Sequence, residues 1–473
     1  MMYKKVTQEI KEEIEKNVGK NNVIDDSERK FDYSHDEFSL PEIRREPELV
    51  VKPERTKDVA TILKLANKEM IPVTPRGGAT GLCGGCVPSE GGIVLSLENM
   101  NRILEIDRDN QMAVVEAGVR LTDFYEKVEE AGLFFPPHPG DESAMIGGVI
   151  ATNAGGSRAV KYGVIRNYVR GIEVVLPSGD IINLGGKIMK SSTGYNLINL
   201  IIGSEGTLGI ITKAIIHLLP QPPLIRSLII PYDDLEEAIE TVPQLSANRI
   251  LPMAVEFVPK EVINVTEEYL KKRWPCQEGK TYLLVILDAS GEEEMDRLSE
   301  SVAKICLDKG AIDIYVADSQ KKQEEVLEIR SKIYEAIKAH TIEVLDITVP
   351  RAEIPGHVKK VQEISRKYGI WLPTFGHAAD GNVHTHLMKA RFEDGHIIPV
   401  EEEDWKKRID DVRRELYKDC KKRGGVISGE HGIGLVKKKY LSFVLEEKQI
   451  ELMRSLKKLF DPQRILNPNK IFD

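Results

Sequence analysis

The sequence predicts an α+β protein built from two parts of different character. The first part, up to about residue 222, is dense in glycine and alternates short apolar strands with helices. The second part shows the order βαββαβ with one extra helix in the middle. This is the order of the ferredoxin-like split βαβ arrangement, which has an antiparallel sheet. Pro222 and Pro223 lie between the two parts and mark a natural boundary.

The first part opens with a helical segment, residues 1–44, in which charges alternate at helical spacing in "KKVTQEIKEEIEKN". Residues 46–78 then indicate strand, helix and strand. Apolar positions from Val59 to Ala66 recur at i, i+3, i+4 and i+7, so we expect a one-faced helix that begins near Thr56. Strands follow at "GGIVLSL" and "MAVVEAGV", and a helix at "TDFYEKVEEAG" ends at Gly132.

The second part supplies its four strands in the segments "SLIIPY", "MAVEFVP", "TYLLVILDA" and "AIDIYVAD". The two helices of the motif are "DDLEEAIETVPQL" and "EEEMDRLSESVAKICLDKG". A helix that carries Arg330 comes next, followed by a strand in "DITVP", a further helix and a hairpin around residue 380. From Glu401 onward the chain is expected to be mostly helical.

Composition excludes several classes of protein. Lys and Arg total 66 against 75 acidic residues, a net charge of −9, so nucleic acid is not an expected partner. No stretch approaches the ~20 apolar residues that a transmembrane segment requires. The N-terminus lacks the apolar core of a signal peptide, and the five scattered cysteines are an odd number. We therefore expect reduced thiols and a cytoplasmic location.

The stretch "PRGGATGLCGGCVPSEGG", residues 75–92, admits two interpretations. Cys83 and Cys86 form a Cys-x-x-Cys pair that suits thiol redox chemistry. A structural zinc site is disfavoured because the chain has no second such pair, and a thioredoxin-like site is disfavoured because Cys86 runs into a loop. Backbone this dense in glycine can instead bring successive N–H groups against a phosphate, and this interpretation is favoured.

Two further glycine-rich stretches, residues 137–163 and 203–212, lie in the same part of the chain. None follows the G-x-G-x-x-G pattern of a dinucleotide Rossmann fold, so NAD is disfavoured. The three stretches, in this order, resemble the FAD-binding domain of the vanillyl-alcohol oxidase and p-cresol methylhydroxylase superfamily. Within it, "PRGGATGLCGG" is most similar to the "PRGGGTGLSGG" of the glycolate oxidase flavin subunit and the D-lactate and D-2-hydroxyglutarate dehydrogenases.

The resemblance implies a two-part FAD-binding domain of the p-cresol methylhydroxylase type, with a ferredoxin-like cap. It also implies non-covalent FAD, because residues 75–92 lack the histidine that many relatives use to attach the flavin. The residues that it assigns to the FAD site are Pro75, Arg76, Gly77, Gly78, Ala79, Thr80, Gly81, Pro139, Gly140, Ser143, Gly147, Gly148, Asn153, Gly155, Gly156, Gly206, Ile211 and Asn467.

The stretch "TFGHAADGNVHTHL" contains three histidines around a hairpin signal, Asp380-Gly381. A two-residue turn at this dipeptide pairs His377 with His384, whose Cβ atoms would then lie ~5 Å apart on one face. His386 projects from the same face. A lone histidine is more often a core or surface residue, but three on one face favour a metal site.

The same family carries "GHxGDGNxH" and "SxEHGxG" at these places, here with Ala379 in place of the usual glycine. The resemblance implies that His377, His384 and Glu430 bind a divalent metal and that His431 is the catalytic base. Two histidines and one carboxylate leave coordination positions open and suit Zn²⁺, Fe²⁺ or Mn²⁺.

The resemblance further implies that Arg330 binds the substrate carboxylate, with Tyr334 and His386 in the substrate site. Some hydroxyglutarate-specific relatives have a lysine where this chain has Val344, which favours a short substrate.

The expected function is oxidation of a small D-2-hydroxy acid, D-lactate first, with glycolate or D-2-hydroxyglutarate as the alternatives. Electrons would pass to an electron-transferring flavoprotein or an iron–sulfur subunit. An alternative of another class is a subunit that chiefly transfers electrons. The expected domains are the N-terminal segment at 1–44, an FAD domain at 45–222, a cap with the metal site at 223–420, and a segment returning to the FAD domain at 421–473.

Overall fold

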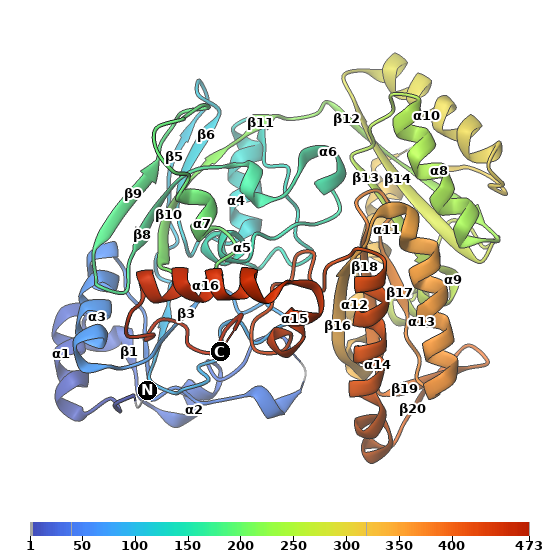
Figure 1. Cartoon of the computed structure of the whole chain (residues 1–473). Coiled ribbons are helices and arrows are strands. Elements are labelled where there is room, and N and C mark those ends of the chain that lie inside the picture. The colour runs from blue at the N-terminus through green and yellow to red at the C-terminus, as the bar shows by residue number, and fades with distance from the viewer. Residues whose placement is uncertain (1–2, 39, 318, 473) are drawn as a thin grey trace. The chain divides into compact units, whose positions relative to one another are not determined.

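The computed structural model describes residues 3–38, 40–317 and 319–472, and it divides into two compact units (Figure 1). The first unit comprises Met1–Gly155, Val164–Gln221 and Glu430–Asp473, and the second comprises Gly156–Gly163 and Pro222–Gly429. The N-terminal segment thus belongs to the first unit. The chain returns to that unit at Glu430, nine residues later than the expected position, residue 421.

The first unit contains a four-stranded sheet and a five-stranded sheet. The four-stranded sheet has the order β1 (Val23–Ile24), β2 (Leu49–Val51), β4 (Ile93–Ser96), β3 (Val73–Arg76). Strands β2, β4 and β3 are parallel, and β1 is antiparallel to β2. The five-stranded sheet is antiparallel, in the order β5 (Ile103–Asp107), β6 (Met112–Glu116), β10 (Ile210–His217), β8 (Val169–Val175), β9 (Ile181–Gly185).

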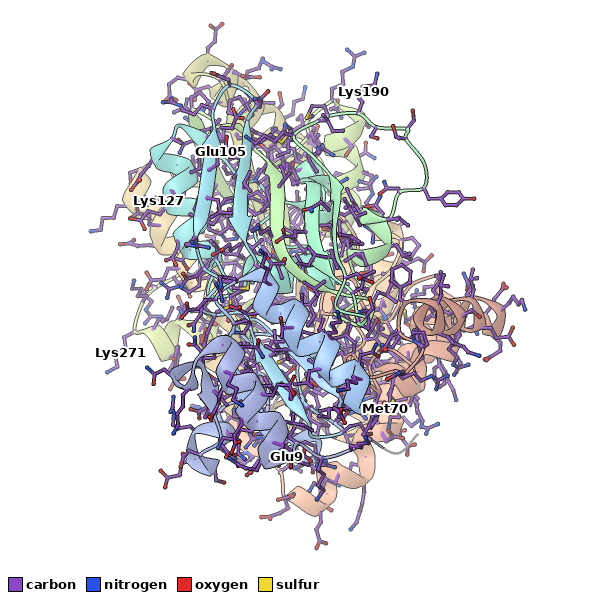
Figure 2. The ribbon with its side chains drawn as sticks, turned by 90° about the vertical axis from the view of Figure 1, so that its left-hand side faces the viewer. Glu9, Met70, Glu105, Lys127, Lys190 and Lys271 are labelled. Atoms are coloured by element: carbon purple, nitrogen blue, oxygen red, sulfur yellow. The ribbon has the colours of Figure 1, made fainter. Side chains whose placement is uncertain are left out.

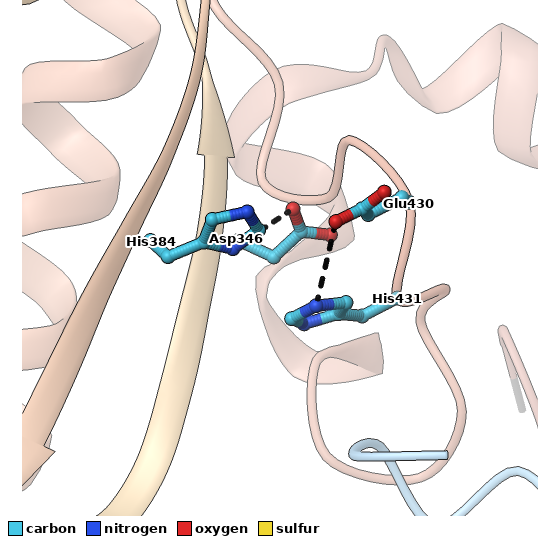
Figure 3. A group of neighbouring side chains, drawn as sticks. All are labelled: Asp346, His384, Glu430 and His431. Atoms are coloured by element: carbon cyan, nitrogen blue, oxygen red, sulfur yellow. Dashed lines mark ion pairs between the residues drawn. The ribbon is translucent and has the colours of Figure 1, made fainter. Parts of the chain in front are cut away.

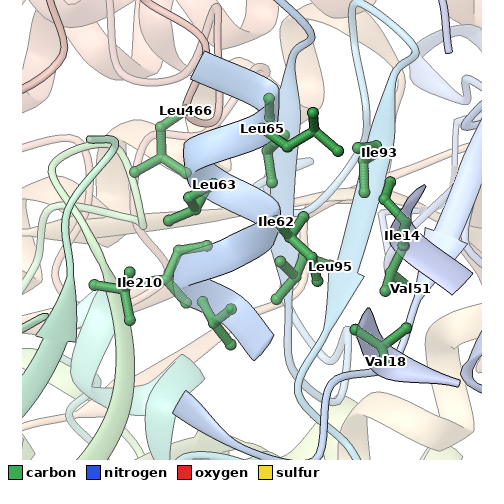
Figure 4. Packing of buried hydrophobic residues seen from close by; sticks show 14 of the residues in the cluster. Ile14, Val18, Val51, Ile62, Leu63, Leu65, Ile93, Leu95, Ile210 and Leu466 are labelled. Atoms are coloured by element: carbon green, nitrogen blue, oxygen red, sulfur yellow. The ribbon is translucent and has the colours of Figure 1, made fainter. Parts of the chain in front are cut away.

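Helix α3 (Thr56–Glu69) confirms the predicted start at Thr56 and buries the predicted apolar face. Met70, labelled in Figure 2, follows it in the left-handed conformation, with φ of 57°. The buried face of α3 packs in a core with residues of both sheets and of the C-terminal segment, and Figure 4 shows Ile62, Leu63, Ile210 and Leu466 in it. Burial of such side chains stabilises the fold by about 1.5–3 kcal/mol each. The C-terminal segment is therefore part of the core of this unit.

The other elements of the first unit are the two-stranded sheet β7 (Leu133–Phe134) and β11 (Leu219–Pro220), and the helices α1 (Gln8–Val18), α2 (Ser27–Phe31), α4 (Leu121–Glu130), α5 (Ile146–Thr152), α7 (Ile198–Ile201), α15 (Leu441–Val444) and α16 (Glu447–Phe460).

The second unit is built on a seven-stranded antiparallel sheet. Its order is β15 (Tyr315–Ala317), β12 (Leu224–Tyr232), β14 (Thr281–Ala289), β13 (Ala254–Pro259), β17 (Thr374–His377), β18 (Asn382–Met388), β16 (Thr341–Thr348). The first four strands have the ferredoxin-like order that the sequence predicts. The hairpin β17–β18 and strand β16 extend that sheet beyond β13.

Helices α8 (Leu235–Ala247) and α10 (Glu292–Leu307) pack against β12 and β14. The remaining elements of this unit are α6 (Ala159–Tyr162), α9 (Lys260–Leu270), α11 (Gln320–Ser331), α12 (Ile333–Ile337), α13 (Ile354–Tyr368), α14 (Glu402–Lys422) and the hairpin β19 (Ala390–Glu393) and β20 (His396–Pro399). Across the described residues, no helix combines the length and the apolar character that crossing a membrane requires.

Candidate functional site

The first two glycine-rich loops approach each other closely in the first unit. A Cβ at Gly78 would lie 3.0 Å from the carbonyl oxygen of Ser143, and one at Gly77 would lie 3.5 Å from the Cβ of Met145. Side chains larger than hydrogen would therefore separate the loop after β3 from the loop before α5. This close backbone approach explains the density of glycine here.

The third loop and the C-terminal segment reach the same place. Gly206 has φ of +68°, and a Cβ there would lie 2.6 Å from Cγ of Pro75. The Asn467 side chain donates to the carbonyls of Gly85, at 3.0 Å, and Glu205, at 2.7 Å. The structure thus brings together the three loops and Asn467, as the sequence predicts for one binding site.

Space remains open at three glycines of this region. A Cβ built at Gly85, Gly140 or Gly148 has no protein atom within 4 Å. Backbone that is rich in N–H groups and left uncovered by side chains suits a phosphate-bearing cofactor. The arrangement therefore fits the pyrophosphate of FAD.

Not every predicted FAD residue points its side chain into this space. The Arg76 guanidinium donates to the carbonyls of His35, at 2.6 Å, and Asp32, at 2.8 Å, so it anchors β3 to the N-terminal segment. Asn153 ends α5 with φ of 54°, and its side chain accepts from the N–H of Arg166 at 3.2 Å.

Four other predicted FAD residues lie as follows. Ser143 donates to Asp141 at 2.6 Å, and Ile211 is buried in β10. Gly156 belongs to the second unit, whereas Gly155 belongs to the first.

The N-terminal segment supplies a residue that the sequence did not indicate. Asp36 is buried, and its carboxylate accepts from the backbone N–H groups of Gly84, at 2.7 Å, and Phe38, at 3.1 Å. Burial raises the pKa of Asp36 to about 6, although these N–H donors oppose the shift. Asp36 therefore holds the first glycine loop in place.

The two cysteines of this loop are separate thiols. The Cys83 thiol is buried and donates to the carbonyl of Gly432 at 3.3 Å. Arg76 donates to the Cys86 sulfur at 3.4 Å, and burial raises the pKa of the Cys86 thiol to about 11. A thiol that stays protonated is a poor nucleophile, so the geometry favours the phosphate-loop interpretation over the thiol one.

Glu430 and His431 lie on the loop with which the chain re-enters the first unit. A Cβ at Gly155 would lie 2.8 Å from the Glu430 carboxylate, which places Glu430 directly beside a predicted flavin residue. The carboxylate of Glu205 accepts from the N–H groups of Ile433, at 2.7 Å, and Gly434, at 2.8 Å. Glu205 therefore fixes this loop, and it too was missed by sequence reasoning.

In the second unit, polar side chains share one face of the sheet across four strands. Directly opposed residues form the row Glu256 (β13), His377 (β17), Asn382 (β18) and Thr348 (β16). The next row holds Phe375, His384 and Asp346, and the row after it holds His386 and Val344. Opposed residues of an antiparallel sheet point to the same side, so all of these side chains line one surface.

The predicted pairing of His377 with His384 is wrong. His377 opposes Asn382, and the turn comprises the four residues 378–381 in place of Asp380-Gly381 alone. The two histidines are diagonal neighbours, with Nε2 atoms 3.5 Å apart. The register differs from the predicted one by two residues, and because side chains alternate with a period of two, both histidines still lie on one face.

Each of these histidines turns Nδ1 toward a buried carboxylate. His377 Nδ1 lies 2.5 Å from Glu256, and His384 Nδ1 lies 4.0 Å from Asp346. Burial opposes the ionisation of Glu256, but the charges of His377 and Arg330 outweigh it and lower the pKa of Glu256 to about 2. The Nε2 atoms are thereby directed toward each other.

The predicted substrate residues gather on the same surface. The Arg330 guanidinium lies over the Phe375 ring, 5.3 Å from its centroid, and donates to Glu256. His386 stacks on Phe375 with 4.9 Å between ring centroids, and the Tyr334 ring lies 5.8 Å from that of His386. The structure therefore places Arg330 and His386 against one aromatic ring, with Tyr334 next to His386.

Sequence reasoning assigned no role to Glu256 or Asp346. Glu256 is the one acidic residue of its strand, "AVEFVP", and Asp346 lies among apolar residues in "VLDITV"; a carboxylate in an apolar stretch is the signal that could have found them. Figure 3 draws Asp346 with His384, and Glu430 with His431, all of residue types that bind divalent metals.

Comparison with known proteins identifies the chain. Residues 47–185 match the family model described as FAD binding domain, and residues 221–471 match that of the C-terminal domain of FAD linked oxidases. The chain belongs to the FAD-linked oxidases. It is therefore an enzyme with FAD as its cofactor, and the predicted family is confirmed.

Several relatives of this FAD-linked oxidase are similar over most of their length. A D-lactate dehydrogenase of Archaeoglobus fulgidus is 47% identical, with 89% of this chain and 91% of the relative covered. One from Anaerostipes hadrus is 41% identical, with 99% and 98% covered. The glycolate oxidase subunit GlcD of Bacillus subtilis is 38% identical, with 99% and 97% covered.

Solved structures show the fold of this FAD-linked oxidase. p-Cresol methylhydroxylase with substrate bound has a TM-score of 0.80 at 18% identity, with 100% of this chain and 99% of that chain covered. A 4-ethylphenol oxidase from Gulosibacter chungangensis has a TM-score of 0.77 at 20% identity, with 98% and 96% covered. The predicted p-cresol methylhydroxylase-type fold is confirmed.

Proposed function

We propose that this FAD-linked oxidase oxidises a small D-2-hydroxy acid, with D-lactate as the first candidate, to the corresponding 2-keto acid. The names of its relatives, D-lactate dehydrogenase and glycolate oxidase subunit, support this class of substrate. The observation that carries the proposal is the polar sheet face of the second unit. There, two histidines with facing Nε2 atoms lie beside an arginine suited to a carboxylate.

We propose that FAD binds non-covalently in the first unit, with its pyrophosphate at the glycine loops. The open space at Gly140 and Gly148 supports this position. Asn467 and Gly206 join the C-terminal segment and the third loop to the first loop, so the cradle is built from segments far apart in sequence.

The donor set on the sheet face fits a divalent metal ion. Two nitrogens that bind one tetrahedral zinc ion at ~2.0–2.1 Å lie about 3.4 Å apart. The Nε2 atoms of His377 and His384 are 3.5 Å apart. Their Nδ1 atoms face carboxylates, an arrangement that is common among metal-binding histidines.

Glu430 is proposed as the third ligand. It is joined by a peptide bond to Gly429, whose N–H donates to the Asp346 carbonyl at 3.0 Å. Ser428 donates to the Asp346 carboxylate at 2.8 Å. The two residues that precede Glu430 in the sequence are thus fixed to strand β16.

Each step of the proposed reaction has a residue assigned to it. Arg330 binds the substrate carboxylate, because a guanidinium matches a carboxylate in shape and charge. His431 accepts the hydroxyl proton at a ring nitrogen as the general base. When bound, FAD supplies an acceptor for the Cα hydrogen and its electron pair, and the metal ion supplies positive charge beside the hydroxyl oxygen. The substrate loses one proton and one hydride, which leaves the 2-keto acid.

A short substrate is favoured by the surroundings of Arg330. Val344 is buried opposite His386, and Phe375 and Tyr334 cover the neighbouring space. None of these three side chains is a cation that could bind a second carboxylate, so D-lactate is favoured over D-2-hydroxyglutarate.

The test is anaerobic reduction of the bound flavin by a panel of 2-hydroxy acids. The reduction is measured as the loss of the flavin's visible absorbance. We expect D-lactate to reduce the flavin fastest, with L-lactate inactive and D-2-hydroxyglutarate slow. Reduction by L-enantiomers, or by none of the panel, would contradict the proposal. Metal analysis of the same preparation and chelation before mixing test the metal ion separately.

We also propose that the reduced flavin passes its electrons to a partner protein, an electron-transferring flavoprotein or an iron–sulfur subunit. The chain has no G-x-G-x-x-G sequence for NAD and only one close pair of cysteines, too few for an iron–sulfur cluster. The pure chain should reduce artificial dyes with D-lactate but should form no NADH. NADH formation is measured by its absorbance at about 340 nm. NADH formation by the chain alone would contradict the need for a partner.

A further inference from the structure

Glu256 is an unusual residue for its position. It is 2% exposed in the central strand β13, with the apolar residues Val255 and Phe257 on either side. A buried carboxylate destabilises a fold unless charged or hydrogen-bonding groups pair with it. Its partners therefore indicate why it is there.

The two carboxylate oxygens of Glu256 have different partners. Oε1 lies 2.5 Å from Nδ1 of His377, and Oε2 accepts from Nη2 of Arg330. His377 comes from the neighbouring strand β17, where it directly opposes Glu256, and Arg330 comes from the last turn of α11. A single carboxylate thus joins the proposed metal ligand to the proposed substrate-binding residue.

The contact with His377 determines which ring nitrogen is available to a metal. An ionised carboxylate only accepts hydrogen bonds, so Nδ1 of His377 must carry the proton. In the neutral imidazole, which is the form that binds a metal, Nε2 then keeps its lone pair, and it is the atom that faces Nε2 of His384 at 3.5 Å. Glu256 therefore selects the tautomer that can bind the ion.

The contact with Arg330 determines the direction of the guanidinium. Glu256 holds Nη2 while the Phe375 ring lies 5.3 Å below the guanidinium carbon. Nε of Arg330 is buried and has no hydrogen-bond partner among the described residues. Two fixed contacts therefore orient a cation that still has donor capacity for a ligand.

We infer that Glu256 is a positioning residue that orients His377 toward the metal ion and Arg330 toward the substrate carboxylate at the same time. The inference rests on the proposed function, since it presumes a metal at His377 and a carboxylate at Arg330. Glu256 itself contacts neither, and it acts through these two side chains.

The decisive variant is Glu256→Gln, which keeps the shape and removes one acceptor oxygen. If the amide oxygen faces Arg330, the amide NH₂ faces His377 and forces the proton onto Nε2. If the amide oxygen faces His377, the NH₂ meets the guanidinium, donor against donor. Either orientation breaks one of the two contacts.

The matched control is Glu343→Gln in the same sheet. Glu343 is also buried, and its carboxylate accepts from Arg413 at 2.8 and 2.6 Å. It lies on β16 next to Val344, so its side chain points to the opposite face from His384. The control removes a comparable buried ion pair without touching the proposed site.

Metal affinity is measured on the full-length, FAD-loaded protein by competition between the protein and a coloured chelator for Zn²⁺ and for Mn²⁺. Glu256→Gln should weaken metal binding about 10–100-fold, as is typical when the hydrogen-bond partner of a ligand is lost. KM for D-lactate should rise about tenfold or more at saturating metal. FAD content should be unchanged, and Glu343→Gln should bind metal and D-lactate as the wild type does.

Wild-type metal affinity and KM in Glu256→Gln would overturn the inference, as would equal losses in Glu343→Gln, which would mean a merely structural role. If the wild type binds neither ion, the proposed metal role is wrong and the inference about His377 is wrong with it. If the wild type binds metal and Glu256→Gln binds it equally well, only the inference is wrong. Should Glu256→Gln not fold, Glu256→Asp keeps the charge but is one methylene too short to reach both partners, and the same losses are expected.

Discussion

The two units contribute to the proposed chemistry with different parts of the polypeptide. In the first unit the glycine loops present backbone, and the space at Gly140 and Gly148 is free of side chains. In the second unit the strands present side chains, which meet because cross-strand neighbours point to the same face. Substitutions should therefore act differently in the two units. In the first unit, a methyl group added in the open space of the glycine loops should weaken FAD binding. In the second unit, a changed donor or acceptor on the polar sheet face should impair the reaction.

The largest effect is expected on the sheet face. His384→Ala should lower the rate of flavin reduction by D-lactate about a hundredfold or more, because charge stabilisation by a metal contributes several kcal/mol. FAD content should stay at the wild-type level, since the glycine loops belong to the other unit. The measurement is stopped-flow absorbance of the flavin together with metal analysis.

A buried histidine of the same unit provides the control for His384→Ala. His357 also lies beside a carboxylate, with Nδ1 2.8 Å from Asp419, but this pair joins α13 to α14 and includes no residue of β17 or β18. His357→Ala should lower the unfolding temperature and leave the reduction rate per bound flavin unchanged. If His384→Ala loses all of its metal and still reduces the flavin at the wild-type rate, the proposed difference between the two units is wrong.

The next effect concerns the thiol of the first loop. Burial raises the pKa of Cys86 from 9.0 to about 11, so the thiolate fraction at pH 8 should be about a hundredfold lower than for an ordinary cysteine. The rate of alkylation by iodoacetamide should rise about tenfold per pH unit up to pH ~11, with Cys86→Ala used to assign the signal. Rapid alkylation at pH 8 would restore the thiol-redox interpretation.

A smaller effect, of opposite sign on two quantities, is expected at Gly148. Gly148→Ala places a methyl group in the open space of the cradle and should weaken FAD binding about tenfold, or ~1.4 kcal/mol. Because Gly148 lies inside helix α5, alanine should stabilise the FAD-free protein by up to about 1 kcal/mol. Calorimetric titration with FAD measures the affinity for FAD, and urea unfolding measures the stability of the FAD-free protein.

The control for Gly148→Ala is Gly186→Ala, which also has open space around the added methyl group but lies outside the three loops. It should leave FAD affinity unchanged. Equal FAD affinity in Gly148→Ala and the wild type would mean that the flavin does not occupy this space.

The smallest effect is expected when both loop cysteines are replaced. Serine at Cys83 keeps a donor for the Gly432 carbonyl, and alanine at Cys86 removes a protonated thiol with one long hydrogen bond from Arg76. The double variant Cys83→Ser, Cys86→Ala should retain flavin content and turnover within about twofold. Loss of turnover with FAD retained would show that a thiol takes part in the reaction.

Much of the first unit could be predicted from local sequence. Glycine at Gly78 or Gly206 is required by close backbone approach, and such a requirement is visible in the residue type itself. The order of strands and helices in the second unit was equally readable, because hydrophobic periodicity and turn residues are local. The predicted register of the histidine hairpin was wrong by two residues, but it still placed His377 and His384 on one face. Only a register error of an odd number of residues would have put them on opposite faces.

What the sequence by itself determined is therefore the fold class, the glycine loops and the face shared by the histidines. Only the tertiary structure decided which carboxylates lie beside these histidines. Glu256 and His377 are 121 residues apart, and they meet because β17 adds to the sheet beside β13. Asp36 reaches Gly84 from the N-terminal segment in the same way. The local sequence predicts the backbone conformation of its own segment. The partner of a buried charge depends instead on which distant strands pair, and this cannot be predicted from one segment alone.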